Sequence, residues 1–254
     1  VAGGCQLTRE VTLLLLEAMI VYFLVLSAHS LRHKFGPVHF YALLGGITAI
    51  MSWVTDAGVA VQFAGITFVV GSTVFYTSIL LGIFVIYVFD GPGATRVAIS
   101  TVVGVSILTP LVAVVLNYQV QLVHASTVTL IPQPSLRVNS ASVLATVLDM
   151  IFLAMVWEFL GRSGWKLHLS VRAYLTLLGV MWLDVVLFTT MAFAGTPIYL
   201  DVAKGTLVSR IVISLLAFPF LYGYLVMQSR KKGQSIVNRP VLSIVRQVAE
   251  IRAE

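Results

Sequence analysis

Charged residues are scarce in this sequence. They make up 10% of its 254 residues, whereas 59% of the residues are hydrophobic. A soluble globular protein has about a quarter charged residues. The apolar residues here also form runs of about twenty, long enough to cross the ~30 Å hydrocarbon core of a bilayer as helices. The composition therefore excludes a soluble protein and predicts an integral protein of the lipid bilayer, with a prokaryotic plasma membrane as the expected location.

Cysteine and catalytic motifs are almost absent as well. Cys5 is the single cysteine, which excludes an intramolecular disulfide and a cysteine-based metal site. The sequence contains no Gly-rich phosphate loop, no HExxH motif and no Ser-His-Asp arrangement of the usual spacing. We therefore expect no catalytic residues, no metal site and no cofactor in this chain. His29 and His33 have the i, i+4 spacing of two metal ligands, but residues at the membrane interface show this spacing more often.

The apolar runs predict an all-α membrane protein, a bundle of about seven transmembrane helices. The basic residues gather in the connections after the odd-numbered spans, and such connections are cytoplasmic by the positive-inside rule. The N-terminus is then outside and the C-terminus cytoplasmic. The same placement explains the net charge of +6 without a nucleic-acid partner. The predicted spans are 11–31, 38–55, 71–89, 95–117, 141–161, 171–194 and 206–228. Retinal proteins share this topology, but the last span contains no Lys to carry the chromophore.

Two of the outer connections are more than simple turns. Residues 59–70 alternate weakly around an Ala-Gly pair, as a short β-hairpin does. In residues 126–139, β-branched residues flank a Pro-rich turn. Either connection can form a lid over the outer mouth of the bundle, and ordinary exposed loops are the alternative.

Four ionisable residues lie well inside predicted spans. At 1.5 Å per residue they share a level between the outer interface and the midplane. A charge at mid-bilayer costs about 2.5–3.5 kcal/mol, so such residues normally face the bundle interior and a partner. We expect them to line one polar cavity, and a purely structural ion-pair network is the alternative. The four residues are Glu17, Asp149, Asp184 and Arg210.

Three further residues are candidates for the same cavity. Asn117 closes the fourth span, and Gln62 lies in the candidate hairpin, both near the level of the charged residues. Trp182 lies close to Asp184 in the sequence and could stack on a planar ligand, with core packing as the alternative role. With three acids against one base, the site favours a cation or a ligand rich in hydrogen-bond donors. Glu158, near the cytoplasmic end, is expected to pair with Arg162 at i, i+4.

The segment after the last span has the pattern of a signalling helix. Val241, Ile244, Val248 and Ile251 recur at intervals of three, four and three, the a/d spacing of a coiled coil, and Pro240 suits the first turn of a helix. We therefore divide the chain into a seven-helix domain, residues 1–228, and a cytoplasmic segment, residues 229–254. The tail predicts a homodimer through this helix, and an amphipathic helix lying on the membrane is the competing interpretation.

The fifth and sixth spans resemble a known family. ATVLDMIFLAMVWEFLGR (145–162) and LTLLGVMWLDVVLFTTMAFAG (175–195) are similar to paired segments of the vitamin-uptake-like, queuosine-precursor transporter family, in which each segment carries an Asp. Asp149 and Asp184 match those positions. Residues 65–96 are similar to the hairpin, third span and Gly-rich turn of the family, so the resemblance covers roughly residues 40–225.

The departures from the family pattern point to its sensor version. Residues 79–84, ILLGIF, lack the carboxylate of the transporters' third span, and Ala145 and Thr146 stand where a Gln is expected. The resemblance then implies retained binding with altered or absent transport. We interpret the chain as a membrane sensor module that binds a small polar, purine-like molecule and signals through its C-terminal helix. A secondary transporter of a queuosine-precursor or nucleobase-like solute is the alternative.

Overall fold

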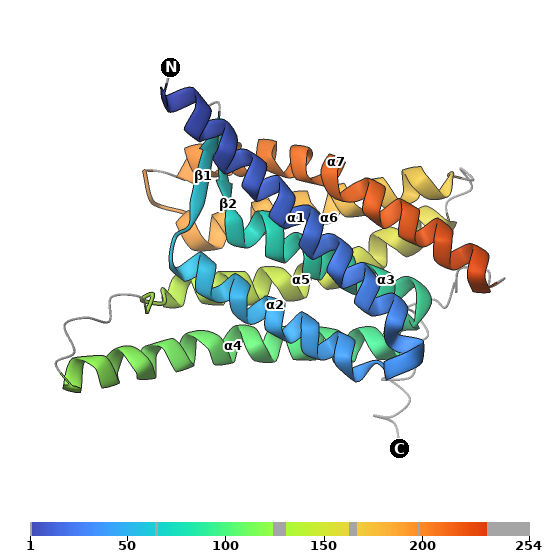
Figure 1. The fold of residues 1–254 in the computed structure, drawn as a ribbon, viewed down its shortest axis with the longest axis horizontal. Coiled ribbons are helices and arrows are strands. Elements are labelled where there is room, and N and C mark those ends of the chain that lie inside the picture. The colour runs from blue at the N-terminus through green and yellow to red at the C-terminus, as the bar shows by residue number, and fades with distance from the viewer. Residues whose placement is uncertain (1, 64–65, 124–130, 163–166, 198, 233–254) are drawn as a thin grey trace.

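The computed structural model describes residues 2–63, 66–123, 131–162, 167–197 and 199–232. Seven α-helices, a two-stranded hairpin and one π-helical turn make up these residues (Figure 1). In chain order they are α1 (Ala2–Phe35), α2 (Val38–Asp56), β1 (Ala60–Phe63), β2 (Ile66–Val69), η1 (Gly71–Tyr76), α3 (Thr77–Phe89), α4 (Gly91–Val123), α5 (Leu136–Arg162), α6 (Leu169–Phe193) and α7 (Tyr199–Lys232).

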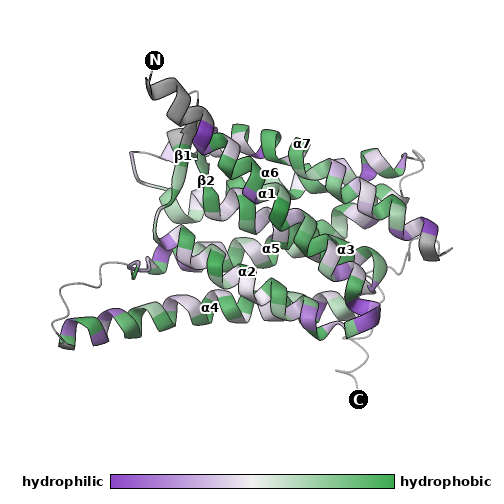
Figure 2. Ribbon diagram, viewed as in Figure 1, coloured by the Kyte–Doolittle hydropathy of each residue, from purple (hydrophilic) through white to green (hydrophobic). Residues whose placement is uncertain are grey.

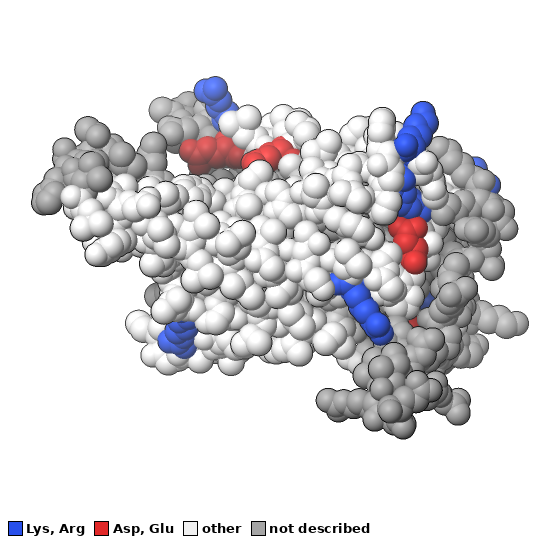
Figure 3. Space-filling model, turned by 90° about the horizontal axis from the view of Figure 1, so that it is seen from below, with Lys and Arg blue, Asp and Glu red and all other residues white. Residues whose placement is uncertain are grey.

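Seven stretches of the described chain are helical, long enough and apolar enough to cross a membrane. By length and composition they are Arg9–Phe35, Val38–Asp56, Gly71–Phe89, Gly91–Leu122, Leu136–Gly161, Leu169–Phe193 and Val202–Arg230. Apolar residues run along all the helices in Figure 2. In Figure 3, most charged side chains lie toward the two ends of the face in view, and one acidic patch on its upper edge reaches nearer the middle. The predicted all-α bundle of seven apolar helices is confirmed, and each predicted span falls on one of these helices.

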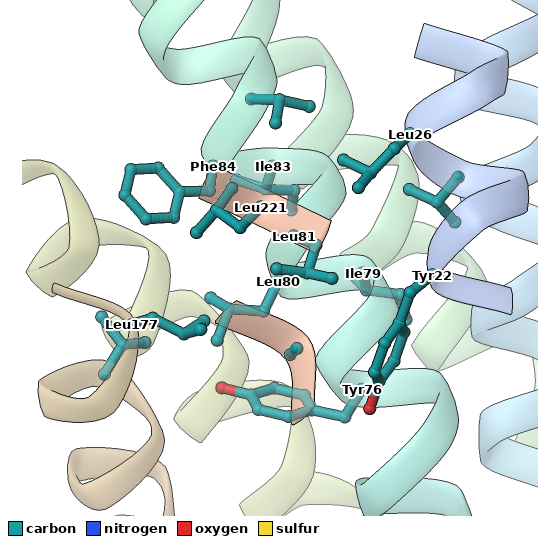
Figure 4. Packing of buried hydrophobic residues seen from close by; sticks show 14 of the residues in the cluster. Tyr22, Leu26, Tyr76, Ile79, Leu80, Leu81, Ile83, Phe84, Leu177 and Leu221 are labelled. Atoms are coloured by element: carbon teal, nitrogen blue, oxygen red, sulfur yellow. The ribbon is translucent and has the colours of Figure 1, made fainter. Parts of the chain in front are cut away.

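Helix α3 is the centre of the bundle. Every residue from Thr77 to Val88 is buried, as expected of a helix that is apolar on all sides. In Figure 4 its side chains point toward Tyr22 and Leu26 of α1, Leu177 of α6 and Leu221 of α7. Its neighbours approach closely at Gly82, where an added Cβ would lie 2.8 Å from Leu44 Cδ2.

The two ends of the bundle differ in their connections (Figure 1). The hairpin end holds β1, β2 and the first residues of α1, α5 and α7. The basic end holds the short turns from α1 to α2 and from α3 to α4, together with the last residues of α7. At the basic end the chain reverses at Gly91, whose φ of +83° is strained for other residues. Which end faces the cytoplasm stays a prediction.

The predicted hairpin at residues 59–70 is confirmed. Strands β1 and β2 pair antiparallel, with Ala60 opposite Val69 and Phe63 opposite Ile66. In the second unusual connection, residues 131–135 are irregular and α5 begins at Leu136. The rest of that connection, residues 126–130, lies outside the described residues, as does the predicted coiled-coil tail after Lys232.

Candidate functional site

Arg210 of α7 and Asp184 of α6 form a buried ion pair near the hairpin end. A guanidinium nitrogen of Arg210 donates to the Asp184 carboxylate, and the two side chains are 3% and 10% exposed. The other terminal nitrogen of Arg210 donates to the backbone carbonyl oxygen of Ser72 over 2.7 Å. Arg210 therefore ties α7 to both α6 and η1.

Asp149 of α5 lies beside this pair and is completely buried. Its Oδ2 accepts a hydrogen bond of 2.5 Å from the hydroxyl of Tyr76. The Arg210 guanidinium lies over the same Tyr76 ring, 5.0 Å from its centre. Two polar atoms of this cluster, Asp149 Oδ1 and Arg210 Nε, have no hydrogen-bond partner in the part of the chain that the structure describes. Buried polar atoms are normally satisfied by protein, water or ligand.

The π-helical turn η1 explains how a backbone carbonyl becomes available to Arg210. A π-turn interrupts the regular i→i−4 ladder and is common at functional sites. Here the carbonyl of Ser72 accepts from Arg210, and the carbonyl of Thr73 accepts from Tyr22 of α1 over 2.8 Å. The turn begins at Gly71, which packs so closely on Thr55 of α2 that any larger residue would clash. The turn therefore holds Ser72 and Tyr76 in the middle of the bundle.

A polar cleft of about 50 Å³ opens beside the ion pair. Helices α2, α4, α5, α6 and α7 and the turn η1 all contribute to its wall. Most of the lining side chains carry a hydroxyl or an amide, and Phe188 adds an aromatic ring. The polar and aromatic residues of the wall are Ser52, Thr55, Ser72, Tyr76, Ser106, Asn139, Ser142, Thr146, Asp184, Phe188 and Arg210.

The polar cleft continues toward the hairpin. A wider cavity of about 570 Å³ shares Asp184, Phe188 and Arg210 with it and is bounded by Ala60 of β1 and Val69 of β2. The hairpin therefore borders the mouth of the cleft, in the position expected of a lid.

A hydrogen bond between α2 and α5 lies at the rim of the polar cleft. The Asn139 amide of α5 donates to Asp56 Oδ1, at the end of α2, over 3.0 Å. Since Asn139 also lines the cleft, this contact closes one side of the rim between α2 and α5.

Asp149, Asp184 and Arg210, predicted from the sequence to lie together, do so in the structure. Glu17 and Trp182 are not brought to them, since both side chains are exposed on the outside of the bundle, Trp182 to 44%. Trp182 precedes Asp184 by two residues, which is about 200° around a helix of 3.6 residues per turn. It therefore faces away from the cleft.

The two amide candidates lie elsewhere as well. Asn117 donates to the carbonyl oxygens of Ala113 and Pro132, over 2.9 and 3.1 Å, and so ties the end of α4 to the segment before α5. Gln62 pairs with Thr67 in the hairpin backbone, and its side chain is outside the described residues. Glu158 accepts a hydrogen bond of 2.5 Å from Tyr87, whereas the side chain of its expected partner Arg162 is not described.

A second polar cluster holds α7 at the basic end. His29 of α1 contacts Tyr224 of α7 through Nδ1, over 2.6 Å, and Asp90 through Nε2, over 2.9 Å. Arg32 donates to the other oxygen of Asp90 over 2.9 Å, and Gln228 donates to Tyr224 over 2.9 Å. His29 thus serves in a network between helices. The described residues contain no group of three or more metal-ligating side chains.

Burial raises the pKa of Asp90, but the hydrogen bond from His29 and the charges of His29 and Arg32 outweigh it. The pKa of Asp90 therefore lies below its ordinary value of 3.8. The carboxylate is ionised at neutral pH, as its contact with Arg32 requires.

Sequence reasoning missed Tyr76 and the hydroxyl residues of the wall. Ser and Thr are common in membrane helices, where they often bond to carbonyls of their own helix, so they give little signal. Thr146, which departs from the family pattern, lines the cleft one helical turn from Asp149.

Comparison with known proteins identifies the family. The model of the vitamin uptake-like sensor family matches residues 22–225, most of the chain, so the chain belongs to this family. The resemblance found in the sequence is thereby confirmed, and the family implies a membrane sensor. No curated protein and no solved structure gave a match.

Proposed function

We propose that this member of the vitamin uptake-like sensor family is the membrane input module of a signalling protein. In this proposal a small polar molecule binds in the polar cleft and in the wider cavity that continues it toward the hairpin. Helix α7 then passes the state of this site to an output domain. The observation that carries the proposal is the position of Arg210, which lines the cleft and also belongs to the last helix. A ligand that competes for Arg210 therefore acts directly on α7.

The hairpin end faces the outside in this proposal. Arg32, Lys34, Arg96 and Arg230 lie at the basic end, which favours a cytoplasmic position for it. A ligand then enters beneath the hairpin and reaches Asp184 and the hydroxyl groups without crossing the membrane.

The wall of the cleft favours a planar heterocycle with both hydrogen-bond donors and acceptors, such as a purine-like base. Its hydroxyl groups can donate or accept, and the partnerless Arg210 Nε is a donor. Phe188 offers a ring for stacking, the role first expected of Trp182.

The signal route follows from the two anchors of α7. Arg210 holds the helix at the cleft, and Tyr224 and Gln228 hold it at the basic end. Pro219 lies between them and removes one hydrogen bond of the helix, which makes bending at that point easier. We propose that α7 has two arrangements, one favoured with ligand and one without. A ligand changes the balance between them only to the extent that it binds one arrangement more tightly than the other.

A thermal-shift screen of the purified protein tests the binding step. The panel contains nucleobases, deazapurines and small amines. A ligand at a hundred times its Kd adds about 2.7 kcal/mol of stability, a shift that is easily measured. Ser142→Ala and Thr146→Val alter the wall and leave the ion pair intact, so both should weaken the shift. Glu17→Gln, an acid outside the cleft, is the control that keeps it. A shift that survives both wall variants would contradict the proposed site.

Transport is the second candidate, because one observation favours it. Asp149 is a fully buried carboxylate with one partnerless oxygen, as a proton-coupling residue can be. A transporter accumulates the screened ligand in proteoliposomes, and the accumulation collapses with the proton gradient and with Asp149→Asn. A sensor binds the same ligand without uptake.

A further inference from the structure

Glu17 presents a carboxylate on the outer surface of α1, within a candidate membrane span. It lies eight residues, or about 12 Å along the helix, from Arg9 at the start of that span. Leu13, Ile20 and Leu24 surround it and are also exposed. No hydrogen bond or ion pair of Glu17 is found within the described residues. Facing lipid chains, such a group is unfavourable and calls for a partner.

Among the side chains that the structure describes, no other exposed charge lies as deep. The remaining exposed charged side chains that the structure describes are within five residues of the end of a span or between spans. The long outer face of α4 makes the contrast clear, because Val97 to Tyr118 contains no charged residue. Lipid alone can cover α4, whereas the outer face of α1 calls for a partner that can pair with the Glu17 carboxylate.

Helix α7 has an exposed stripe next to α1. A groove of about 510 Å³ runs between the two helices, with Phe23 and Ser30 on one side and Pro219, Gly223 and Met227 on the other. At spacings of three or four residues the stripe leads back along α7 to Lys204, an exposed cation near the hairpin end. The α1–α7 face, defined here as the exposed surface from Glu17 across this groove to Lys204, therefore carries one acid and one base.

Near the basic end the stripe has the spacing of a coiled coil. Gly223, Met227 and Arg230 are exposed on α7 and recur at intervals of four and three, as d, a and d positions of a heptad do. The earlier stripe residues Pro219 and Lys204 fall outside this register.

We propose that the α1–α7 face is the membrane part of a dimer interface and that its occupant is a second copy of this chain. In a two-fold interface each contact occurs twice with the roles exchanged. Glu17 on α1 of one copy pairs with Lys204 on α7 of the other, and the groove takes up side chains of the opposite stripe. The interface places α7, the proposed output helix, next to its counterpart. It does not depend on the identity of the ligand.

Charge exchange tests the pairing. In the full chain, dimer formation is measured in lipid nanodiscs or native vesicles by single-molecule photobleaching. Glu17→Lys and Lys204→Glu each place two like charges together and should raise the dissociation constant of the dimer about tenfold or more, as close interfacial charge pairs do. The double variant restores the opposite charges and should recover the dimer. Equal dimer fractions in all four proteins would overturn the pairing.

Cysteine cross-linking tests the face independently of the charges. In a Cys5→Ser background, Met227→Cys on the stripe should form a cross-linked dimer on oxidation. Val114→Cys, equally apolar but on the outer face of α4, should not. Cross-linking at Val114 alone, or monomers throughout, would overturn the proposal. The ligand-induced thermal shift is measured in the same variants. If it is unchanged while dimer formation changes, the dimer interface and the binding site are tested independently of each other.

Discussion

Replacing Tyr76 by Phe probes the most buried polar contact of the cluster. The change removes the hydroxyl that donates to Asp149 over 2.5 Å and keeps the ring beneath the Arg210 guanidinium. Asp149 is completely buried, and its other carboxylate oxygen already lacks a partner among the described residues. The variant therefore leaves both carboxylate oxygens without a hydrogen bond.

The magnitude follows from the burial of the acceptor. Interhelical hydrogen bonds within membranes average about 0.6 kcal/mol, whereas leaving a buried polar group without a partner costs about 1–3 kcal/mol. We expect Tyr76→Phe to lower the free energy of unfolding by about 2 kcal/mol. Tyr22→Phe is the matched control, because Tyr22 is also buried but donates over 2.8 Å to the carbonyl of Thr73, a backbone acceptor whose second lone pair stays available to the helix. It should lower the same free energy by about 1 kcal/mol or less.

The double variant Tyr76→Phe, Asp149→Leu completes the test. Replacing both partners of a buried hydrogen bond by apolar groups is often nearly neutral, so the double variant should be more stable than Tyr76→Phe alone. Unfolding in mixed detergent micelles, followed by tryptophan fluorescence, gives the four free energies of the cycle. Strictly additive effects, or equal losses in Tyr76→Phe and Tyr22→Phe, would refute the reasoning.

Two further predictions concern the basic end. A Cβ at Gly161 would collide with the Arg172 guanidinium, which donates to the carbonyl of Trp157 and stacks on its ring at 3.8 Å. Gly161→Val should therefore cost about 1–3 kcal/mol in the same unfolding assay, and Gly179→Ala, where the nearest atom is 3.8 Å away, should cost less. The pKa of Asp90 lies below its ordinary value, so its contribution to stability is complete above about pH 4 and is lost as the pH falls through the folded-state pKa. Melting temperatures should then fall more steeply below about pH 4 in the wild type than in Asp90→Asn, and parallel curves would contradict this.

The sequence predicted the helices well because the membrane leaves few alternatives. Apolar runs of span length must be helical, and breakers such as Gly36, Gly58 and Gly91 mark their ends with positive φ values. The grouping of Asp149, Asp184 and Arg210 was predictable for a similar reason, since buried charges in a membrane seek one another.

The faces of the helices were harder to predict. Glu17 and Trp182 lie at a suitable depth, but depth does not determine which side of a helix a residue occupies. Only the packing around α3 decides that. Equally, no pattern in GSTVFY (71–76) predicts a π-helical turn, yet this turn frees the carbonyl that Arg210 uses. The packing of the helices likewise turns Ser106 and Ser142 toward the cleft, which their positions in the sequence do not reveal.

The central claim is that the polar cleft is open to solutes at the hairpin end. Labelling of a cysteine in its wall tests this claim without knowledge of the ligand. Ser142→Cys in a Cys5→Ser background places one thiol in the cleft, and Leu221→Cys, fully buried among core residues, is the control. A membrane-impermeant thiol reagent is added to right-side-out vesicles, and the rate of modification is measured.

We expect the thiol at position 142 to react from the outside and the thiol at position 221 to stay unmodified. A ligand found in the thermal-shift screen should slow the reaction at position 142. A thiol at position 142 that never reacts, or that reacts only from the cytoplasmic side in inverted vesicles, would contradict the account.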